Sequence, residues 1–160
     1  MDDPGSQPTL RIHGPDASAG TPGLAPLAEP GKPSVLTSFQ NLILVVDDEP
    51  QIRDMTAAML TRMGYHVVTA GDGVRALAAF AAHADDVRLV IADVIIPKLD
   101  GVTLCRVIRE MSPNVRILAM SGLSNTSSPA PMEGLADAFL YKPFKVQALV
   151  EAVRRLMQAP

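Results

Sequence analysis

One carboxylate ends the most regular apolar stretch of this sequence. Residues 89–92 are all apolar, Asp93 follows them, and Pro97 stops the apolar segment that comes next. An apolar run of this kind predicts a buried strand of a parallel sheet, apolar on both faces. Open α/β sheets bind ligands at the carboxyl ends of their strands, so Asp93 stands where a carboxylate can act chemically. An aspartate that only caps the next turn is the alternative interpretation.

Three other predicted strands, all mostly apolar, are also followed by a residue with a reactive or charged side chain. These segments, with the residues that end them, are 42–46 with Asp47 and Asp48, 115–120 with Ser121, and 138–141 with Lys142. The carboxyl ends of parallel strands lie at one edge of a sheet, so these side chains can meet although 94 positions separate Asp48 from Lys142. A helix cap, a turn hydroxyl or a solvated charge would explain each residue alone, but their coincidence favours one site.

The chemistry of this set points to phosphoryl transfer. Three carboxylates held close together raise each other's pKa unless a cation neutralises them. Oxygen ligands without His or Cys favour Mg²⁺ over zinc. A metal-bound Asp93 can attack as a nucleophile, while the lysine and the hydroxyl supply donors to a group rich in negative oxygens. The predicted product is an aspartyl phosphate on the protein itself.

Strands and helices alternate along the segment that positions these residues. Residues 65–69 form a further predicted strand, and helical periodicity begins near Pro50, Gly73, Val102 and Val146. The apolar residues at helical spacing are Ile52, Met55, Met59 and Met63; Val74, Leu77, Phe80 and Ala81; Leu104, Val107 and Ile108; and Val146, Leu149, Val150, Val153 and Leu156. Five strands with intervening helices predict an α/β fold in which right-handed crossovers cover both faces of a parallel sheet.

Two segments lack the composition of regular structure. Residues 1–40 contain seven of the 14 prolines and five of the 11 glycines, so we expect a disordered tail or linker, with the globular domain at 41–158. Residues 124–134 read SNTSSPAPMEG. Ser, Asn and Thr compete with helix formation, and the prolines remove donors. We therefore expect a loop at 124–130, with one or two helical turns at most near 131–135.

Composition excludes several classes of protein. The net charge of −3 gives no basic footprint for nucleic acid. No apolar run approaches the length of a membrane helix, and the N-terminus lacks the pattern of a signal peptide. The single cysteine, Cys105, excludes an internal disulfide and is expected in the core. These features predict a soluble, cytoplasmic protein.

Residues 42–157 resemble the receiver domain of bacterial response regulators over their whole length. The motifs that carry the resemblance are VVDDEP at 45–50, DVIIPKLDG at 93–101, SG at 121–122 and KPF at 142–144. The steps of 45 from Asp48 to Asp93, 28 to Ser121 and 21 to Lys142 suit that family. The resemblance implies a flavodoxin-like, doubly wound sheet of five parallel strands in the order 2-1-3-4-5.

The resemblance also implies a phosphoacceptor role and a magnesium site. Asp93 would accept a phosphoryl group from the phosphohistidine of a sensor histidine kinase or a phosphotransfer protein. Asp48 and Asp93 would bind Mg²⁺ directly, together with the backbone carbonyl of Ile95, and Asp47 would act through water. Such a receiver catalyses its own phosphorylation and slow dephosphorylation and is not classed as an enzyme.

Three more residues receive roles from the same resemblance. Lys142 and Ser121 would each bond a phosphoryl oxygen. Phe139 matches the switch aromatic that turns inward when Ser121 moves, although Phe lacks the hydroxyl of the usual Tyr. The peptide before Pro143 is usually cis in the family. Lys142 is expected to matter more for switching than for folding, because a charge at a strand end contributes little to the core.

Ile95 and Leu123 are apolar at two positions that tune phosphate lifetime in the family, and they predict slow loss of the phosphoryl group. A magnesium-dependent aspartyl phosphohydrolase is one rival, but such enzymes need a second acid where this chain has Ile95. A degenerate receiver that acts only as an interaction module is another, although the acidic pair and the lysine are both present.

The expected partners are the phosphodonor protein and a downstream protein target, without direct contact to nucleic acid or membrane. The surface that uses the fourth helix would be incomplete, which favours a monomer over a DNA-binding dimer. One helix follows Lys142, so the chain is expected to be a stand-alone receiver or the receiver end of a hybrid kinase.

Overall fold

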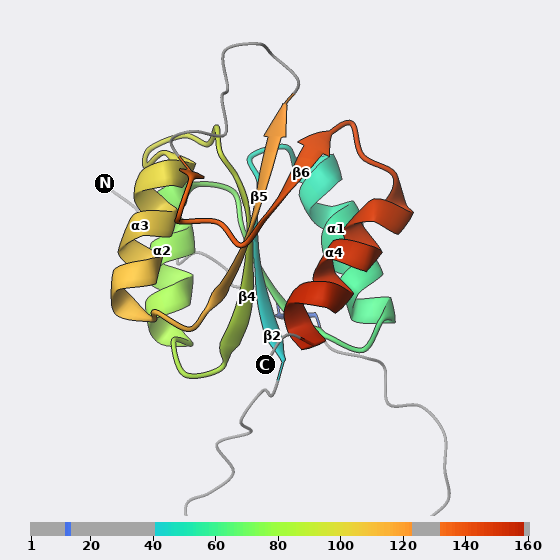
Figure 1. Ribbon diagram of the computed structural model, residues 1–160, viewed down its shortest axis with the longest axis horizontal. Helices are drawn as coiled ribbons and strands as arrows, with labels where there is room; N and C mark the ends of the chain where they lie inside the picture. The colour runs from blue at the N-terminus through green and yellow to red at the C-terminus, as the bar shows by residue number, and fades with distance from the viewer. Residues whose placement is uncertain (1–11, 14–40, 123–131, 159–160) are drawn as a thin grey trace, which may run out of the picture.

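A single sheet with helices on both faces makes up the part of the chain that the computed structural model describes, which is residues 12–13, 41–122 and 132–158 (Figure 1). The strands are β1 (Ile12–His13), β2 (Leu42–Val46), β3 (His66–Ala70), β4 (Val87–Asp93), β5 (Arg116–Gly122) and β6 (Ala138–Lys142). The helices are α1 (Pro50–Arg62), α2 (Gly73–Ala82), α3 (Gly101–Met111) and α4 (Val146–Gln158). Within these residues, no helix has the length and apolar character needed to cross a membrane.

The strand order confirms the predicted topology. The sheet runs β1-β3-β2-β4-β5-β6, and every neighbouring pair from β3 to β6 is parallel. Numbered from Leu42 onward, the five parallel strands therefore have the order 2-1-3-4-5 of a flavodoxin-like, doubly wound fold.

The two-residue strand β1 is an addition to the predicted sheet. Ile12 and His13 pair antiparallel with Val68 and Val67 at the open edge of β3. These two residues depart from the predicted disorder of the N-terminal segment, because an unpaired strand edge offers backbone donors and acceptors to any extended segment. Residues 1–11 and 14–40 lie outside the described residues, so the prediction for them stays a prediction.

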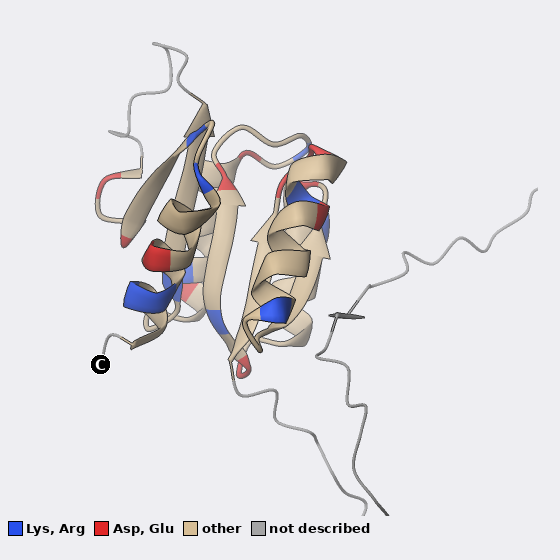
Figure 2. Cartoon of the chain, turned by 90° about the vertical axis from the view of Figure 1, so that its right-hand side faces the viewer, with Lys and Arg blue, Asp and Glu red and all other residues tan. Residues whose placement is uncertain are grey.

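Two apolar layers lie on opposite faces of the sheet. Leu42, Leu44 and Val46 of β2 belong to the layer under α2 and α3, whereas Ile43 and Val45 belong to the layer under α1 and α4. All five side chains are buried. Figure 2 shows the central strands as mostly uncharged, with acidic and basic residues at strand ends, in turns and on helices. A sheet covered on both faces therefore leaves only its edges for polar chemistry.

The inward faces of the helices differ in part from the predicted ones. Phe80, Leu104 and Leu149 are buried as expected. Met55, Val74, Ala81 and Val146 are exposed, and small residues such as Thr56, Ala57, Ala76 and Ala79 are buried in their place. Apolar spacing cannot detect this, because small side chains let a helix pack closely without being strongly hydrophobic. Cys105 is buried in the core as predicted, and burial raises the pKa of its thiol to about 12.

Arg109 ties the end of α3 to the segment that enters β6. Its guanidinium donates to the carbonyl oxygens of Pro113, Val115 and Leu135 at 3.0, 2.6 and 2.8 Å, and to Asp137 Oδ2 at 2.8 Å. The same carboxylate oxygen accepts the backbone N–H of Ile117 at 2.8 Å.

One helical turn precedes this junction, in the region where one or two turns at most were predicted. The N–H groups of Leu135 and Ala136 donate to the Met132 carbonyl. The loop predicted at 124–130 lies outside the described residues.

We expect Asp137→Asn to lower the free energy of unfolding by about 1.5–3 kcal/mol at neutral pH, the usual range for hydrogen bonds to a charged group. Burial alone would raise the pKa of the Asp137 carboxyl, but the bonds from Arg109 and the Ile117 N–H outweigh it, so the pKa lies below 3.8. The stabilisation is therefore present above pH 4 and is lost as the pH falls through the lowered pKa. Urea unfolding of both proteins from about pH 7 to pH 2 measures it, and a difference that stays constant with pH contradicts it.

Candidate functional site

The carboxyl ends of β2 and β4 place two aspartates side by side. The two strands pair in parallel, with Val46 opposite Ala92. Asp47 and Asp93 are the residues that follow this pair, so they lie together at the edge of the sheet. The predicted convergence of strand ends is thus present at the two central strands.

Asp47 is the most deeply buried charged residue of this edge. Its exposed fraction is 0%. Oδ1 accepts the backbone N–H of Glu49 at 2.9 Å, and Oδ2 accepts Lys142 Nζ at 2.8 Å. Burial raises the pKa of the Asp47 carboxyl above its ordinary value, although the bonds from Lys142 and the Glu49 N–H counteract part of the rise.

Asp93 divides its two carboxylate oxygens between the backbone and a cation. Oδ1 accepts the N–H of Ile95 at 2.8 Å, and Oδ2 accepts Lys142 Nζ at 2.5 Å. The peptide after Asp93 is anchored as well, because Val94 N–H donates to the Met120 carbonyl of β5 at 2.9 Å. The carboxylate is therefore held in one orientation from both sides.

Lys142 joins the carboxylates into one electrostatic unit. It ends β6 opposite Gly122, and its ammonium contacts Asp47, Asp93 and, at 3.3 Å, Glu49 Oε1. Its side chain is only 12% exposed. Burial alone would lower the pKa of Lys142, but the hydrogen bonds that its ammonium donates to both aspartates, and their negative charges, raise the pKa above its ordinary value. The peptide between Lys142 and Pro143 is cis, as the resemblance implied.

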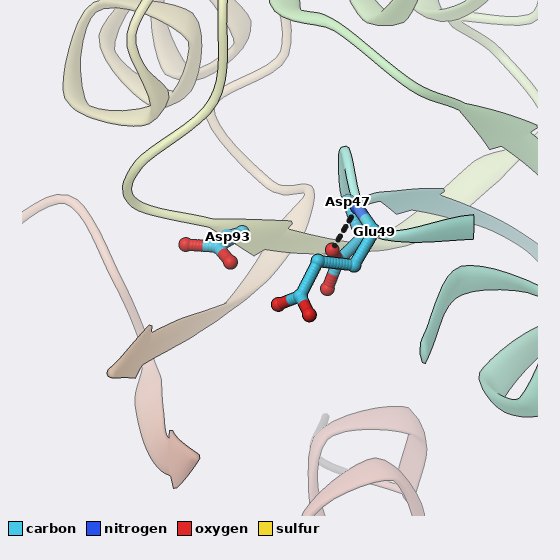
Figure 3. Close-up of side chains that lie close together, drawn as sticks. All are labelled: Asp47, Glu49 and Asp93. Carbon is cyan, nitrogen blue, oxygen red and sulfur yellow. Dashed lines mark hydrogen bonds between the residues drawn. The ribbon is translucent and has the colours of Figure 1, made fainter. Parts of the chain in front are cut away.

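The acidic cluster contains Glu49 in addition to two of the predicted residues. Carboxylate oxygens of Asp47, Glu49 and Asp93 lie within 4.8 Å of one another (Figure 3). Asp48, which the resemblance assigned to direct metal binding, is exposed and is not a member of this cluster. The chain bends at Asp48, directly after β2, and this turn rather than strand alternation sets the directions of the three acidic side chains. The only signal in the sequence was a third acid immediately after the Asp47-Asp48 pair.

Ser121 and Phe139 lie on the same face of the sheet, on the neighbouring strands β5 and β6. Ser121 is buried, and its hydroxyl makes only a long bond of 3.3 Å to the neighbouring Gly122 carbonyl. Phe139 pairs with Ala119, two residues before Ser121, and packs against the layer under α2 and α3. The two side chains therefore share a sheet face, as a coupled pair would require.

Ile95, whose backbone N–H bonds Asp93, has an exposed side chain. The Ile95 side chain is 61% exposed, and Leu123 lies outside the described residues.

Arg53, which was not predicted to take part in the site, donates from Nη1 to the Asp47 carbonyl at 2.8 Å. A Cβ on Gly71 would meet that Nη1 at 3.0 Å. Arg53 therefore braces the turn after β2 against the turn after β3, a contact between distant segments that no local pattern signals.

The donor set fits a hard divalent cation. The clustered ligand atoms are carboxylate oxygens, with no histidine or cysteine in the group, and this chemistry suits Mg²⁺ better than zinc. Three carboxylates face one ammonium, so negative charge remains in excess. The cluster could therefore hold a metal cation.

Comparison with known proteins agrees with this geometry. A sequence model described as the response regulator receiver domain matches residues 43–154. The chain belongs to the response regulator receiver family. Receiver domains of this family act in two-component signalling, and a phosphoacceptor role fits the acidic cluster of this one.

Related receivers extend the family assignment to particular proteins. The probable transcriptional regulator ycf27 of Cyanidium caldarium is 37% identical over 123 residues, which are 74% of this chain and 48% of that protein. Response regulator MprA of Mycobacterium sp. (strain KMS) is 36% identical over 117 residues, which are 72% of this chain and 50% of that protein. The chain thus spans about half the length of these relatives.

Solved receiver structures show the same fold. The receiver domain of NtrX from Brucella abortus superposes with a TM-score of 0.68 at 35% identity, covering 74% of this chain and 99% of that one. A response regulator receiver domain from Clostridium thermocellum gives a TM-score of 0.68 at 28% identity, covering 73% of this chain and 94% of that one.

We expect Lys142→Met to lower the free energy of unfolding in metal-free buffer by about 3 kcal/mol, because it leaves the buried Asp47 carboxylate without its counter-ion. The sequence suggested that Lys142 contributes little to folding. The structure leads to a different expectation, because the Lys142 ammonium bonds two carboxylates. Adding Asp47→Asn should restore part of the loss, because the amide oxygen still accepts the Glu49 N–H. Urea denaturation measures the stability of both variants. If Lys142→Met is as stable as the wild type, Lys142 does not stabilise the fold as the counter-ion of Asp47.

Proposed function

We propose that Asp93 of this receiver accepts a phosphoryl group from a phosphohistidine on a sensor histidine kinase or a phosphotransfer protein. The observation that carries the proposal is the Lys142 ammonium, which bonds Asp93 and the buried Asp47 together. Lys142 and the two aspartates that it neutralises come from the ends of three strands, and this arrangement places an ammonium where a phosphoryl group on Asp93 would need one. The alternative of a phosphorylation-independent interaction module does not account for this arrangement.

The proposed reaction moves one phosphoryl group. A carboxylate oxygen of Asp93 attacks phosphorus, the phosphorus–nitrogen bond of the phosphohistidine breaks, and the imidazole leaves with the bonding electron pair. The Ile95 N–H bond to Oδ1 supports this role, because it fixes the carboxylate and reduces the number of orientations that must be sampled before attack. The receiver carries the product itself, and receiver domains are generally not classed as enzymes.

Lys142 and Ser121 are the proposed donors to the transferred group. The ammonium can neutralise a phosphoryl oxygen from the position in which it now bonds Asp93. The Ser121 hydroxyl is available because its present bond is long and goes only to its own neighbour. A turn of that hydroxyl toward the phosphoryl group would change the space beside Phe139, which is the proposed switch residue.

Mg²⁺ is the proposed metal at this edge. When bound, it would neutralise the excess negative charge of the carboxylates and of the incoming phosphoryl oxygens. The resemblance assigns Asp48, Asp93 and the Ile95 carbonyl as direct ligands with Asp47 through water, whereas the carboxylates that lie together are Asp47, Glu49 and Asp93. Both sets contain Asp47 and Asp93, and they differ in Asp48 and Glu49.

The proposed output is a contact with a protein partner rather than with DNA. The net charge of −3 supports this, because nucleic-acid binding usually needs a basic surface. The monomer predicted from the sequence belongs to the same proposal. The phosphohydrolase alternative is disfavoured by the exposed, apolar Ile95 at the position where a second acid would act.

We expect acetyl phosphate and Mg²⁺ to add the mass of one phosphoryl group to the wild-type protein and none to Asp93→Ala. Excess chelator should abolish the gain, because the carboxylates then repel the phosphoryl dianion. Mass spectrometry of the intact protein measures both. Full labelling in chelator, or label retained in Asp93→Ala, would overturn the proposal.

The same assay, repeated over a range of Mg²⁺ concentrations, separates the two ligand sets. If Asp48 is the direct ligand, Asp48→Asn raises the Mg²⁺ requirement more than Glu49→Gln does. The reverse order would assign the site to the cluster of Asp47, Glu49 and Asp93.

Loss of the phosphoryl group is expected to be slow and to accelerate about 2- to 10-fold in Ile95→Asn. The amide offers an attacking water one hydrogen bond, an interaction of about 0.5–1.5 kcal/mol that the exposed isoleucine cannot make. Decay of isolated phosphoprotein, followed by mass, gives the rates. Met111→Asn, an equally polar change at an exposed site on the end of α3, is the control, and equal decay in all three proteins would refute the role of Ile95.

A further inference from the structure

The loop of residues 94–100 leads from Asp93 to α3, and it is anchored at both ends. Ile95 N–H donates to Asp93 Oδ1, and Gly101 N–H donates to the Val94 carbonyl at 3.1 Å. Asp100 caps α3 by accepting the Thr103 N–H at 2.9 Å. A Cβ on Gly101 would lie 2.3 Å from the Asp93 carbonyl oxygen, so loop and phosphoacceptor are in direct contact. Movement of the loop therefore moves the groups that orient the Asp93 carboxylate.

The middle of this loop adopts an unfavourable backbone conformation. Lys98 has a φ of 69°, a value that side-chain-bearing residues seldom adopt. Leu99 N–H turns back to the Pro97 carbonyl at 2.9 Å. A backbone in this state persists only where its surroundings hold it there.

The turn between β3 and α2 contacts the loop at residues 97–99 and holds it in this conformation. Gly73 N–H donates to the Pro97 carbonyl at 3.3 Å. A Cβ on Gly73 would lie 2.1 Å from the Leu99 carbonyl oxygen, so only glycine allows this approach. The neighbouring Asp72 binds Lys98 Nζ through Oδ2 at 2.8 Å. The two turns therefore meet through backbone contacts and one ion pair.

Asp72 uses its two oxygens for two purposes. Oδ1 caps α2 by accepting the Arg75 N–H at 2.9 Å, while Oδ2 binds Lys98. The Asp72 side chain is 7% exposed, whereas that of Lys98 is 56% exposed. A second cation, Arg75, lies 3.6 Å from the same oxygen but belongs to α2. Lys98 is thus the cation that connects this buried carboxylate to the loop.

We propose that Asp72 and Lys98 are positioning residues for phosphorylation of Asp93. Their ion pair holds the strained centre of the 94–100 loop against the β3–α2 turn, which keeps the Ile95 N–H on the Asp93 carboxylate. Neither residue touches the reacting atoms, and both act through the loop backbone. This inference rests on the proposed function of Asp93.

Phosphorylation rates in a double-mutant cycle test the pair. Lys98→Met keeps the length and the positive φ of the lysine but removes its charge, and Asp72→Asn keeps an oxygen for the α2 cap. Each change is expected to slow phosphorylation by acetyl phosphate about 3- to 10-fold, and the double variant should be no slower than the slower single variant. Lys98→Arg should recover most of the rate. Arg75→Met removes a cation from the same carboxylate without touching the loop, so it should leave the rate unchanged.

Amide hydrogen exchange at Ile95 in the unphosphorylated protein gives a second readout, independent of phosphate chemistry. Exchange at Ile95 should accelerate in Lys98→Met and Asp72→Asn but not in Arg75→Met. Lys98→Met should resist urea as well as the wild type does, which shows that the faster exchange reflects local opening rather than global unfolding. If exchange is faster in Lys98→Met and Asp72→Asn but the wild type is never phosphorylated, the positioning role of the ion pair is supported and the proposed function is refuted. Three results would overturn the proposed role of the Asp72–Lys98 pair. They are additive effects of the two substitutions on the phosphorylation rate, an unchanged rate in Lys98→Met, or an equal loss of rate in Arg75→Met.

Discussion

Like charges confined to one edge of the sheet are the constraint on which the rest of this site depends. Both faces of the sheet are covered by helices, so polar groups can gather only where strands end. Parallel pairing of β2 and β4 then brings Asp47 and Asp93 together, and Glu49 adds a third carboxylate. The fold can hold this charge because Lys142 reaches the cluster from β6.

The surroundings of the cluster combine rigid and yielding parts. Asp93 is held rigidly by the Ile95 N–H and by Lys142. Ser121, by contrast, makes only one long bond through its hydroxyl. If Asp93 is the phosphoacceptor as proposed, a rigidly held acceptor with a weakly held hydroxyl on the neighbouring strand suits a switch, because the incoming group can move the hydroxyl without disturbing the acceptor.

The loop after Asp93 shows how a site is supported by residues that take no part in its chemistry. Its centre carries a positive φ at Lys98, and the β3–α2 turn closes on it through Gly73 and Asp72. Strain of this kind is retained near functional sites when neighbouring contacts over-determine the backbone. The approach of Gly73 to Leu99 is so close that the two turns must move together.

The sequence by itself determined the strands, their alternation with helices and three of the charged residues that meet at the edge, which are Asp47, Asp93 and Lys142. Buried parallel strands are apolar on both faces, so residues 42–46, 89–92 and 138–141 were recognisable as continuous runs, and the polar residues that end them marked one edge. The resemblance to receivers supplied the strand order and the cis peptide before Pro143, both of which the structure contains. These features are local in sequence or follow from a specific set of motifs.

Tertiary structure alone decided which side chains meet. Glu49 joined the acidic cluster and Asp48 did not, because the direction of a side chain after a strand end depends on how the turn leaves the sheet. Val74 and Val146 lie in the first turns of α2 and α4 and are exposed, whereas the helices are buried through residues further along, such as Phe80 and Leu149. Arg109 with Asp137, Arg53 with the Asp47 carbonyl, and Lys98 with Asp72 join segments far apart in the chain. Such pairs leave no periodic signal, since only the folded backbone sets the distance between them.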